Sequence, residues 1–315
     1  MEIRYLNEQQ VNEMLDMKNC IELMKGIFTA FAEGKMENKL RSVFPVDTGK
    51  VFGIMPAVIP TEEVCGAKLI TAFHTNHAKG LPSHLGIVAV FSNDDGQLQG
   101  ICDGTAITAI RTGAVSALAT DHMARKDSST LCLIGGGVQA TMHLDAITLV
   151  RDIKKVTIWC PTLAESEKFC EKHRERYPEI EFVAYEQCKD AVAEADIVCT
   201  VTPSSTPVLM GRWVKPGTHI NAVGACSKTA RELDSECTAK ARFFCDNYDS
   251  CRNEAGDYLF PLNEGLITEK HLLGDLAEVV SGKVQPRLTD ADITVFESQG
   301  LACEDVVCAA WLLKQ

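Results

Sequence analysis

The chain has 315 residues, of which 46% are hydrophobic and 23% charged, and its 31 basic and 43 acidic side chains give a net charge of −12. This composition is typical of a soluble globular protein, and at roughly 150 residues per domain the length suits two domains. An acidic chain without a long Lys/Arg run is a poor candidate for binding nucleic acid or an anionic membrane surface. We therefore expect small-molecule partners or further copies of the chain itself.

The targeting and redox signals point to the cytoplasm. No apolar run reaches the roughly 18 residues of a membrane span, and the polar N-terminal segment lacks the apolar core of a secretory signal. The 14 cysteines are scattered, without a C-x-x-C pair, and several lie in apolar runs, such as Cys132 and Cys199. Such cysteines are typical of reduced, buried side chains in a cytoplasmic protein.

The first part of the chain predicts one helix followed by strands. Apolar residues recur at helical spacing over 19–33. Short runs bounded by Gly, Pro, Asn and Asp follow, which are typical of strands, at 41–46, 50–58, 65–73 and 84–92. An Ala-rich helix is expected over 105–123.

From residue 129 the pattern changes to alternating strands and helices. A short apolar run ends in glycines at 135–136, a helix extends to about residue 150, a strand covers 156–160, and a charged helix covers 164–176. Strand-length runs follow at 181–185, 195–202, 219–225 and 241–247. This alternation predicts an α/β fold with a doubly wound parallel sheet. The amphipathic segment at the C-terminus would fold back on the first domain, which makes that domain discontinuous.

The turn after the first strand of this alternation fits a dinucleotide-binding pattern. Residues 135–140 match G-x-G-x-x-A. Gly135 can form the tight turn, Gly137 lets the backbone approach a pyrophosphate, and Ala140 lets the helix pack on the strand. The preceding strand, the following helix and the next strand about 20 residues later supply the context that the motif requires. The helix N-terminus would bind the phosphates.

The end of the second strand bears on the choice of nucleotide. An acidic residue at this place would bind the ribose 2′-hydroxyl of NAD and repel the 2′-phosphate of NADP. The sequence has Cys160, Pro161 and Thr162 instead, with neither a carboxylate nor an arginine. We therefore expect NAD(P)H as the cofactor, with NADP slightly favoured over NAD.

Several motifs together resemble the ornithine cyclodeaminase/mu-crystallin family over nearly the whole chain. The run ITAIRTGAVSALAT at 107–120 is specific, because ordinary Rossmann dehydrogenases carry nothing like it before the glycine turn. The motifs are RSVFP with Arg41, GIMPA (53–57), GAKLI with Lys68, GLPSH (80–84), DGTAITAIRTGAVSALAT (103–120), LIGGGVQA (133–140), WVKPGTHINAVGA (213–225), RELD (231–234) and EDVV (304–307).

The resemblance implies a homodimer with an active site in a cleft between two domains. A mixed α/β substrate-binding and dimerisation domain over 1–118, completed by the helix 301–315, would join a Rossmann domain over 119–300. The resemblance places Arg41, Lys68 and Arg111 at the substrate. It places at the coenzyme Ser83, Arg111, Val138, Gln139, Cys160, Thr200, Thr202, Val223 and Ser298. The glycine turn and the strand end add Gly135, Gly137 and Thr162 to that set.

Family members act on small α-imino or α-amino acids, and the residues fit that chemistry. The planar forks of Arg41 and Arg111 suit a substrate carboxylate, and Arg111 interrupts an Ala-rich run where an unused charge would be costly to bury. Lys68 stands in an apolar strand, where it is either an outward-facing edge lysine or the catalytic residue that supports a proton on the imine nitrogen. Burial and two arginines would lower its pKa toward neutrality.

Residues 224–231 separate the activities within the family. Cyclodeaminase members resemble G-G-D-x-x-x-K here, whereas this chain has Cys226 and Ala230 at the Asp and Lys positions. A neutral thiol is a poor base near neutral pH, and alanine does not titrate. The segment resembles instead mu-crystallin-like ketimine reductases and alanine dehydrogenases. We expect an NAD(P)H-dependent reductase of small α-imino acids; the alternatives are ornithine cyclodeaminase, which makes L-proline and ammonia from L-ornithine, and a non-catalytic nucleotide-binding protein.

The remaining polar residues receive weaker assignments. Glu254 and Asp305 are second-choice active-site carboxylates, and Asp305 also suits the first turn of the last helix. Cys226 has no partner base and is interpreted as a structural thiol. We expect no metal site, because the histidines of the segment 74–84 lack further ligands. His84 follows Ser83 and could tune substrate choice.

Overall fold

The computed structural model describes residues 3–73, 76 and 79–315. The chain divides into two compact units, the first made of residues 1–114 and 300–315 and the second of residues 115–299. The boundaries expected from the sequence lie after residues 118 and 300. Among the described residues, no helix is long and apolar enough to cross a membrane.

The described part of the first unit is built on one six-stranded sheet with the order β1-β6-β5-β4-β3-β2. Strand β1 is parallel to β6, and the other neighbours are antiparallel. The strands are β1 Arg4–Leu6, β2 Ser42–Asp47, β3 Lys50–Ile59, β4 Val64–Phe73, β5 His84–Ser92 and β6 Leu98–Asp103. The helices are α1 Glu8–Met14, α2 Met17–Ala32, η1 Pro60–Glu62, the first part of α3 Gly104–Met123, and α11 Ala302–Lys314.

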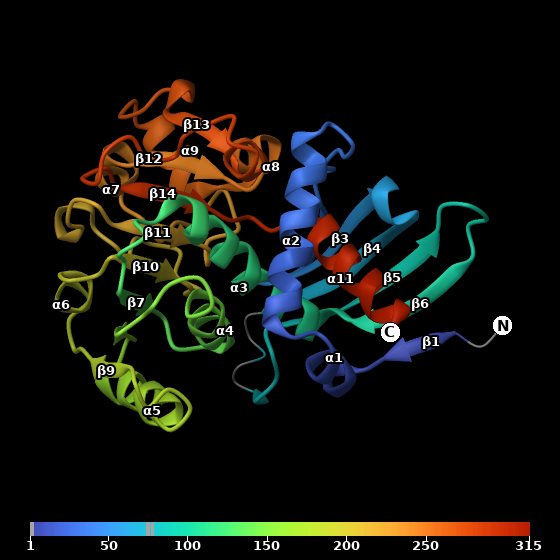
Figure 1. Ribbon diagram of the computed structural model, residues 1–315, viewed down its shortest axis with the longest axis horizontal. Helices are drawn as coiled ribbons and strands as arrows, with labels where there is room; N and C mark the ends of the chain where they lie inside the picture. The colour runs from blue at the N-terminus through green and yellow to red at the C-terminus, as the bar shows by residue number, and fades with distance from the viewer. Residues whose placement is uncertain (1–2, 74–75, 77–78) are drawn as a thin grey trace. The chain divides into compact units, whose positions relative to one another are not determined.

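Helices α2 and α11 form the covering layer of this sheet. Helix α2 begins earlier than the expected residue 19 because the side chain of Asp16 accepts a hydrogen bond from Asn19 N at 2.8 Å and caps it. Helix α11 packs on β3, β4, β5 and β6 and against α2 (Figure 1). The sequence predicts an amphipathic helix here, but residues 302–310 are all buried, including Glu304 and Asp305.

The described part of the second unit is built on an eight-stranded parallel sheet with the order β13-β12-β14-β11-β10-β7-β8-β9. The strands are β7 Thr130–Ile134, β8 Lys155–Trp159, β9 Glu181–Ala184, β10 Ile197–Thr200, β11 His219–Ala222, β12 Arg242–Cys245, β13 Leu272–Asp275 and β14 Thr294–Glu297. The helices are α4 Val138–Ile147, α5 Leu163–Arg174, α6 Cys188–Val192, η3 Gly211–Trp213, α7 Ser235–Lys240, α8 Tyr248–Glu254, α9 Gly256–Asn263, η4 Glu269–His271 and α10 Leu276–Val280.

The order of these strands locates a ligand-binding edge. From β7 the chain moves outward through β8 and β9, and it then returns to place β10 on the other side of β7. In open parallel sheets, ligands bind outside the carboxyl ends of the strands at such a switch point. The α/β class and the Rossmann-type sheet expected from the sequence are confirmed.

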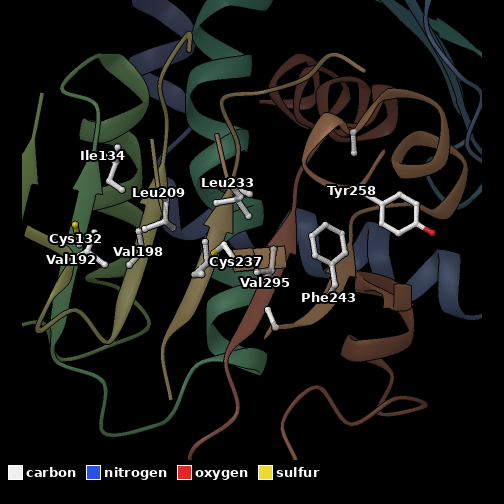
Figure 2. Close-up of a cluster of buried hydrophobic side chains, with 14 of the residues drawn as sticks. Cys132, Ile134, Val192, Val198, Leu209, Leu233, Cys237, Phe243, Tyr258 and Val295 are labelled. Atoms are coloured by element: carbon white, nitrogen blue, oxygen red, sulfur yellow. The ribbon is translucent and has the colours of Figure 1, made fainter. Parts of the chain in front are cut away.

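A continuous hydrophobic cluster packs against this sheet (Figure 2). Cys132 on β7, Val198 on β10 and Val295 on β14 belong to this cluster and are completely buried. At one end of the cluster, the rings of Phe243 and Tyr258 lie 5.8 Å apart. Strands covered on both faces carry such unbroken apolar runs. None of the 14 cysteines forms a disulfide, and 12 of them are buried.

Candidate active site

The first unit contains a buried cluster of four charged side chains. Lys68 on β4 is 1% exposed, and its Nζ lies 2.7 Å from Oδ2 of Asp305 on α11. Arg111 on α3 is 5% exposed; its Nη1 lies 2.7 Å from Glu304 Oε2 and its Nε 3.1 Å from Asp305 Oδ1. Buried charges persist in a protein when they are paired in this way.

The sheet decides the orientation of Lys68. Strand β4 lies between β3 and β5, and Lys68 is paired with Met55 on one side and Val88 on the other. It is therefore not the outward-facing edge lysine that the sequence left open. Its Nζ also donates to Thr108 Oγ1 at 3.3 Å.

The surroundings of Lys68 make its ammonium group more acidic than that of an ordinary lysine. Burial lowers its pKa to about 8, and the positive charges of Arg111 and Arg41 act in the same direction, while Asp305 opposes the fall. Burial would raise the pKa of Asp305, but Arg111 and Lys68 overcome that effect and hold it below its ordinary value. Lys68 therefore faces an ionised carboxylate and can lose its proton in mildly alkaline solution.

The two predicted arginines both lie close to the loop residue Gly300. Its backbone has φ +76°, and a Cβ there would lie 2.6 Å from Arg111 Nη1. Arg41 Nη2 donates to the carbonyl oxygen of Gly300 at 3.0 Å. The structure thus brings Arg41, Lys68 and Arg111 into one connected network, to which α11 supplies the carboxylates.

Ten of the residues predicted at the coenzyme gather at the carboxyl edge of the parallel sheet in the second unit. Backbone hydrogen bonds connect the ends of neighbouring strands along this edge. Gly135 N donates to Trp159 O at 2.9 Å, Val223 N to Thr200 O at 3.1 Å and Ser298 N to Ala222 O at 2.9 Å. The ten residues are Gly135, Gly137, Val138 and Gln139 after β7, Cys160 and Thr162 after β8, Thr200 and Thr202 at β10, Val223 after β11, and Ser298 after β14.

The glycine turn has the shape that a pyrophosphate requires. Gly135 has φ +107°, and a Cβ on it would lie 2.9 Å from Val201 O, so a side chain is excluded. A Cβ on Gly137 would meet nothing within 4 Å. Gly137 is also the N-cap of α4, and no side chain in the described part of the chain caps that helix. The first turn of α4 therefore offers its N–H groups to an anion, and these residues fit a bound dinucleotide.

A buried glutamate that the sequence did not single out organises the same edge. Glu232 is completely buried. Its Oε1 accepts from Thr202 N at 2.7 Å and from Thr202 Oγ1 at 2.6 Å, and its Oε2 accepts from Gly224 N at 2.7 Å. Asp257 in turn accepts from the backbone N–H groups of Glu232 and Leu233 at 2.9 and 2.6 Å. Glu232 therefore determines the path of the chain after β10 and β11.

The other candidates fall into three groups. Ser83 belongs to the first unit, where its Oγ lies 3.0 Å from His84 Nδ1. Cys226 is exposed at the carboxyl edge, with its Sγ 3.4 Å from Val223 O. Within the described ranges, no group of three or more His, Cys, Asp or Glu side chains could hold a metal ion; His74 and His77 lie outside the described residues.

The comparison with protein families decides the relationship that the motifs suggested. The model of the ornithine cyclodeaminase/mu-crystallin family matches residues 2–315. The chain belongs to this family. Among members of the ornithine cyclodeaminase/mu-crystallin family, the ketimine reductase mu-crystallin of Rattus norvegicus is 36% identical over 283 residues, 90% of this chain and 86% of the relative. A delta(1)-pyrroline-2-carboxylate reductase of Bacillus cereus (strain ZK / E33L) is 34% identical over 312 residues, 96% and 94% of the two chains.

Solved structures of related proteins have the same fold. The delta(1)-pyrroline-2-carboxylate reductase of Thermococcus litoralis, in complex with NADH and L-proline, matches with a TM-score of 0.95 and 35% identity over 98% of this chain and 96% of its own. An archaeal alanine dehydrogenase dimer with bound NAD matches with a TM-score of 0.94 and 29% identity over 100% and 96%.

The carboxylates of the buried cluster are the residues that sequence reasoning undervalued. The sequence predicts Asp305 as a second-choice carboxylate and includes Glu304 only in the motif EDVV. A usable signal was present, because both interrupt the apolar run of the last helix as Arg111 interrupts its own. The cost of burying a charge applies equally to acids and bases.

Proposed function

We propose that this member of the ornithine cyclodeaminase/mu-crystallin family is an NAD(P)H-dependent reductase of small α-imino acids, which transfers a hydride from the nicotinamide to the imine carbon. The observation that carries the proposal is the buried Lys68, with a pKa of about 8 and its Nζ 2.7 Å from Asp305. A cation of this acidity can support and exchange a proton on an imine nitrogen near neutral pH. Relatives named as ketimine and pyrroline-2-carboxylate reductases support the same chemistry.

The residues of the first unit would act as follows. Arg41 and Arg111 bind the substrate carboxylate and orient the imine, since a guanidinium fork suits a carboxylate. Lys68 holds a proton at the imine nitrogen, which makes the imine carbon more electrophilic. Asp305 keeps Lys68 charged and oriented. The product is the amino acid, and the reverse reaction would oxidise a 2-amino acid as an alanine dehydrogenase does.

The second unit would bind the coenzyme, which supplies the hydride when bound. The glycine turn and the first turn of α4 would hold the pyrophosphate. Thr202, Val223 and Ser298 lie at the carboxyl edge of the sheet, where Glu232 fixes the backbone, and these positions would face the nicotinamide. At the end of β8 the chain has Cys160 and no carboxylate, which favours NADP over NAD. The side chains around Cys160 also affect the choice between NAD and NADP.

We also propose a cytoplasmic homodimer. The free cysteines and the need for a reduced coenzyme support a reducing compartment. In the sheet of the first unit, β2 is at one edge of the described strands and is exposed along its whole length. Phe44 and Val46 on β2 are 50% and 58% exposed. An apolar edge strand of this kind is a natural contact between two copies.

The decisive experiment measures oxidation of the reduced coenzyme by absorbance. The purified protein is mixed with NADH or NADPH and with pyrroline-2-carboxylate, piperideine-2-carboxylate, or pyruvate with ammonia or methylamine. We expect oxidation with at least one imine, lost in Lys68→Ala and retained in Lys50→Ala, a matched change on the neighbouring strand. Ammonia release from L-ornithine with NAD⁺ at constant absorbance would identify a cyclodeaminase instead. Binding of the dinucleotide without turnover in either assay would favour the non-catalytic alternative.

A further inference from the structure

The turn between β8 and α5 adjoins the glycine turn. Strand β8 is hydrogen-bonded to β7 along its whole length, and Gly135 N donates to Trp159 O at 2.9 Å. A Cβ on Gly136 would lie 2.7 Å from Cys160 Sγ. In a dinucleotide-binding sheet, the end of this second strand faces the adenosine ribose, where the 2′-hydroxyl of NAD or the 2′-phosphate of NADP lies.

The structure brings a carboxylate to this place from further along the chain. Glu165 lies in the first turn of α5, and its side chain folds back to the N-cap Thr162. Its Oε2 accepts from Thr162 N at 3.2 Å and from Thr162 Oγ1 at 2.9 Å, while Thr162 Oγ1 accepts from Glu165 N at 3.3 Å. This reciprocal capping box holds the carboxylate in one position.

The negative charge of Glu165 acts on Cys160, the residue directly after β8. Burial raises the pKa of the Cys160 thiol above its ordinary value, and the negative charge of Glu165 adds to that rise. The segment 160–167 contains no Lys or Arg. The nearest basic residue along the chain is Lys168, one turn further along α5. Within 160–167 a 2′-phosphate would therefore meet the negative charge of Glu165, whereas a ribose hydroxyl would meet an acceptor.

We infer that Glu165 makes this chain select NADH over NADPH. The inference rests on the proposed function only in that the second unit binds a nicotinamide dinucleotide. It reverses the preference for NADP that the sequence suggested, because that preference considered only the residues directly after the strand. Repulsion between a carboxylate and a phosphate a few ångströms apart in partly exposed surroundings corresponds to about tenfold to hundredfold in affinity.

The test is a fluorescence titration that gives the dissociation constants of NADH and NADPH without substrate. We expect the wild-type protein to bind NADH about tenfold or more tightly than NADPH. Glu165→Gln keeps an acceptor for Thr162 and removes the charge, so NADPH binding should tighten and the ratio should approach one. Glu167→Gln removes an exposed charge two residues further along the same helix and should leave the ratio unchanged.

Each other outcome is informative. A wild-type preference for NADPH, or an unchanged ratio in Glu165→Gln, would overturn the inference. If neither dinucleotide binds, the inference and the coenzyme part of the proposed function both fail. If the ratio responds to Glu165→Gln but no imine is reduced, the inference stands and only the proposed reaction fails. Thermal shifts produced by each coenzyme provide a second readout for every variant.

Discussion

Replacing Asp305 with asparagine tests the role assigned to Lys68. Asp305 Oδ2 lies 2.7 Å from Lys68 Nζ, and its charge opposes the effects of burial, Arg111 and Arg41, which together bring the pKa of Lys68 to about 8. An opposite charge at this distance typically shifts a pKa by about 1–3 units. In Asp305→Asn the pKa of Lys68 should therefore fall by about that amount.

The pH dependence of the reductase should report this fall. Protonated Lys68 is the active form, so activity is lost as the pH rises through its pKa. At about pH 7, a pKa of about 8 leaves roughly nine tenths of Lys68 protonated, and a fall of about two units leaves roughly one tenth. We expect Asp305→Asn to lose about tenfold in kcat/KM at about pH 7 and to recover most of it near pH 5.

The matched control is Glu304→Gln, on the neighbouring residue of the same helix. Glu304 contacts Arg111, whereas Asp305 is the carboxylate paired with Lys68 Nζ. This variant should raise KM for the imino acid, and its activity should fall at the same alkaline pH as that of the wild-type protein. The argument would be refuted if folded Asp305→Asn protein, shown by cooperative melting, lost activity at the same alkaline pH as the wild-type protein. An equal loss of activity at every pH would indicate that Asp305 has a structural role only.

Four further variants test the described contacts. Gly300→Ala should raise KM and cost about 1–3 kcal/mol of stability, because φ is +76° and a Cβ would meet Arg111. Gly34→Ala, with φ +70° and open space around it, should cost stability alone in a denaturant titration. Burial raises the pKa of Asp257 from 3.8 to about 8, so the stability that its protonated form contributes is lost as the pH rises through this range. In urea titrations, the free energy of unfolding of Asp257→Asn should therefore depend less on pH than that of the wild-type protein. Phe44→Asp should produce a monomer in light scattering, and an unchanged dimer would reject β2 as the interface.

The parts of the fold that local pattern determines could be predicted. Helix α3 and strand β8 lie within one residue of their expected bounds, since apolar periodicity and turn residues are local signals. No pattern predicted β1, β6, β13 or β14, which are three to six residues long. So few positions cannot establish a period, and their places in the sheets come from contacts distant in sequence.

The candidate site also contains residues that local pattern predicts and residues that depend on contacts distant in sequence. Lys68 and Arg111 could be singled out because a charge inside an apolar run needs an explanation. Their counter-ions come from α11. Asp305 lies 194 residues after Arg111 and is still further from Lys68, so no spacing rule connects them. The sequence did not predict Glu165 for a different reason, because a capping box brings its carboxylate back toward the end of β8 at Trp159, earlier in the chain.

The discontinuous first unit has a consequence for the order of folding during synthesis. Residues 115–299 form a contiguous unit, so the whole of this unit is synthesised before α11. The sheet of the first unit is made much earlier but lacks α11, which covers four of its strands and neutralises Lys68. Until α11 emerges, that sheet would expose an apolar face and an uncompensated lysine. Synthesis of the first unit would thus start before that of the second and finish after it, and this nascent sheet is where a chaperone would be needed.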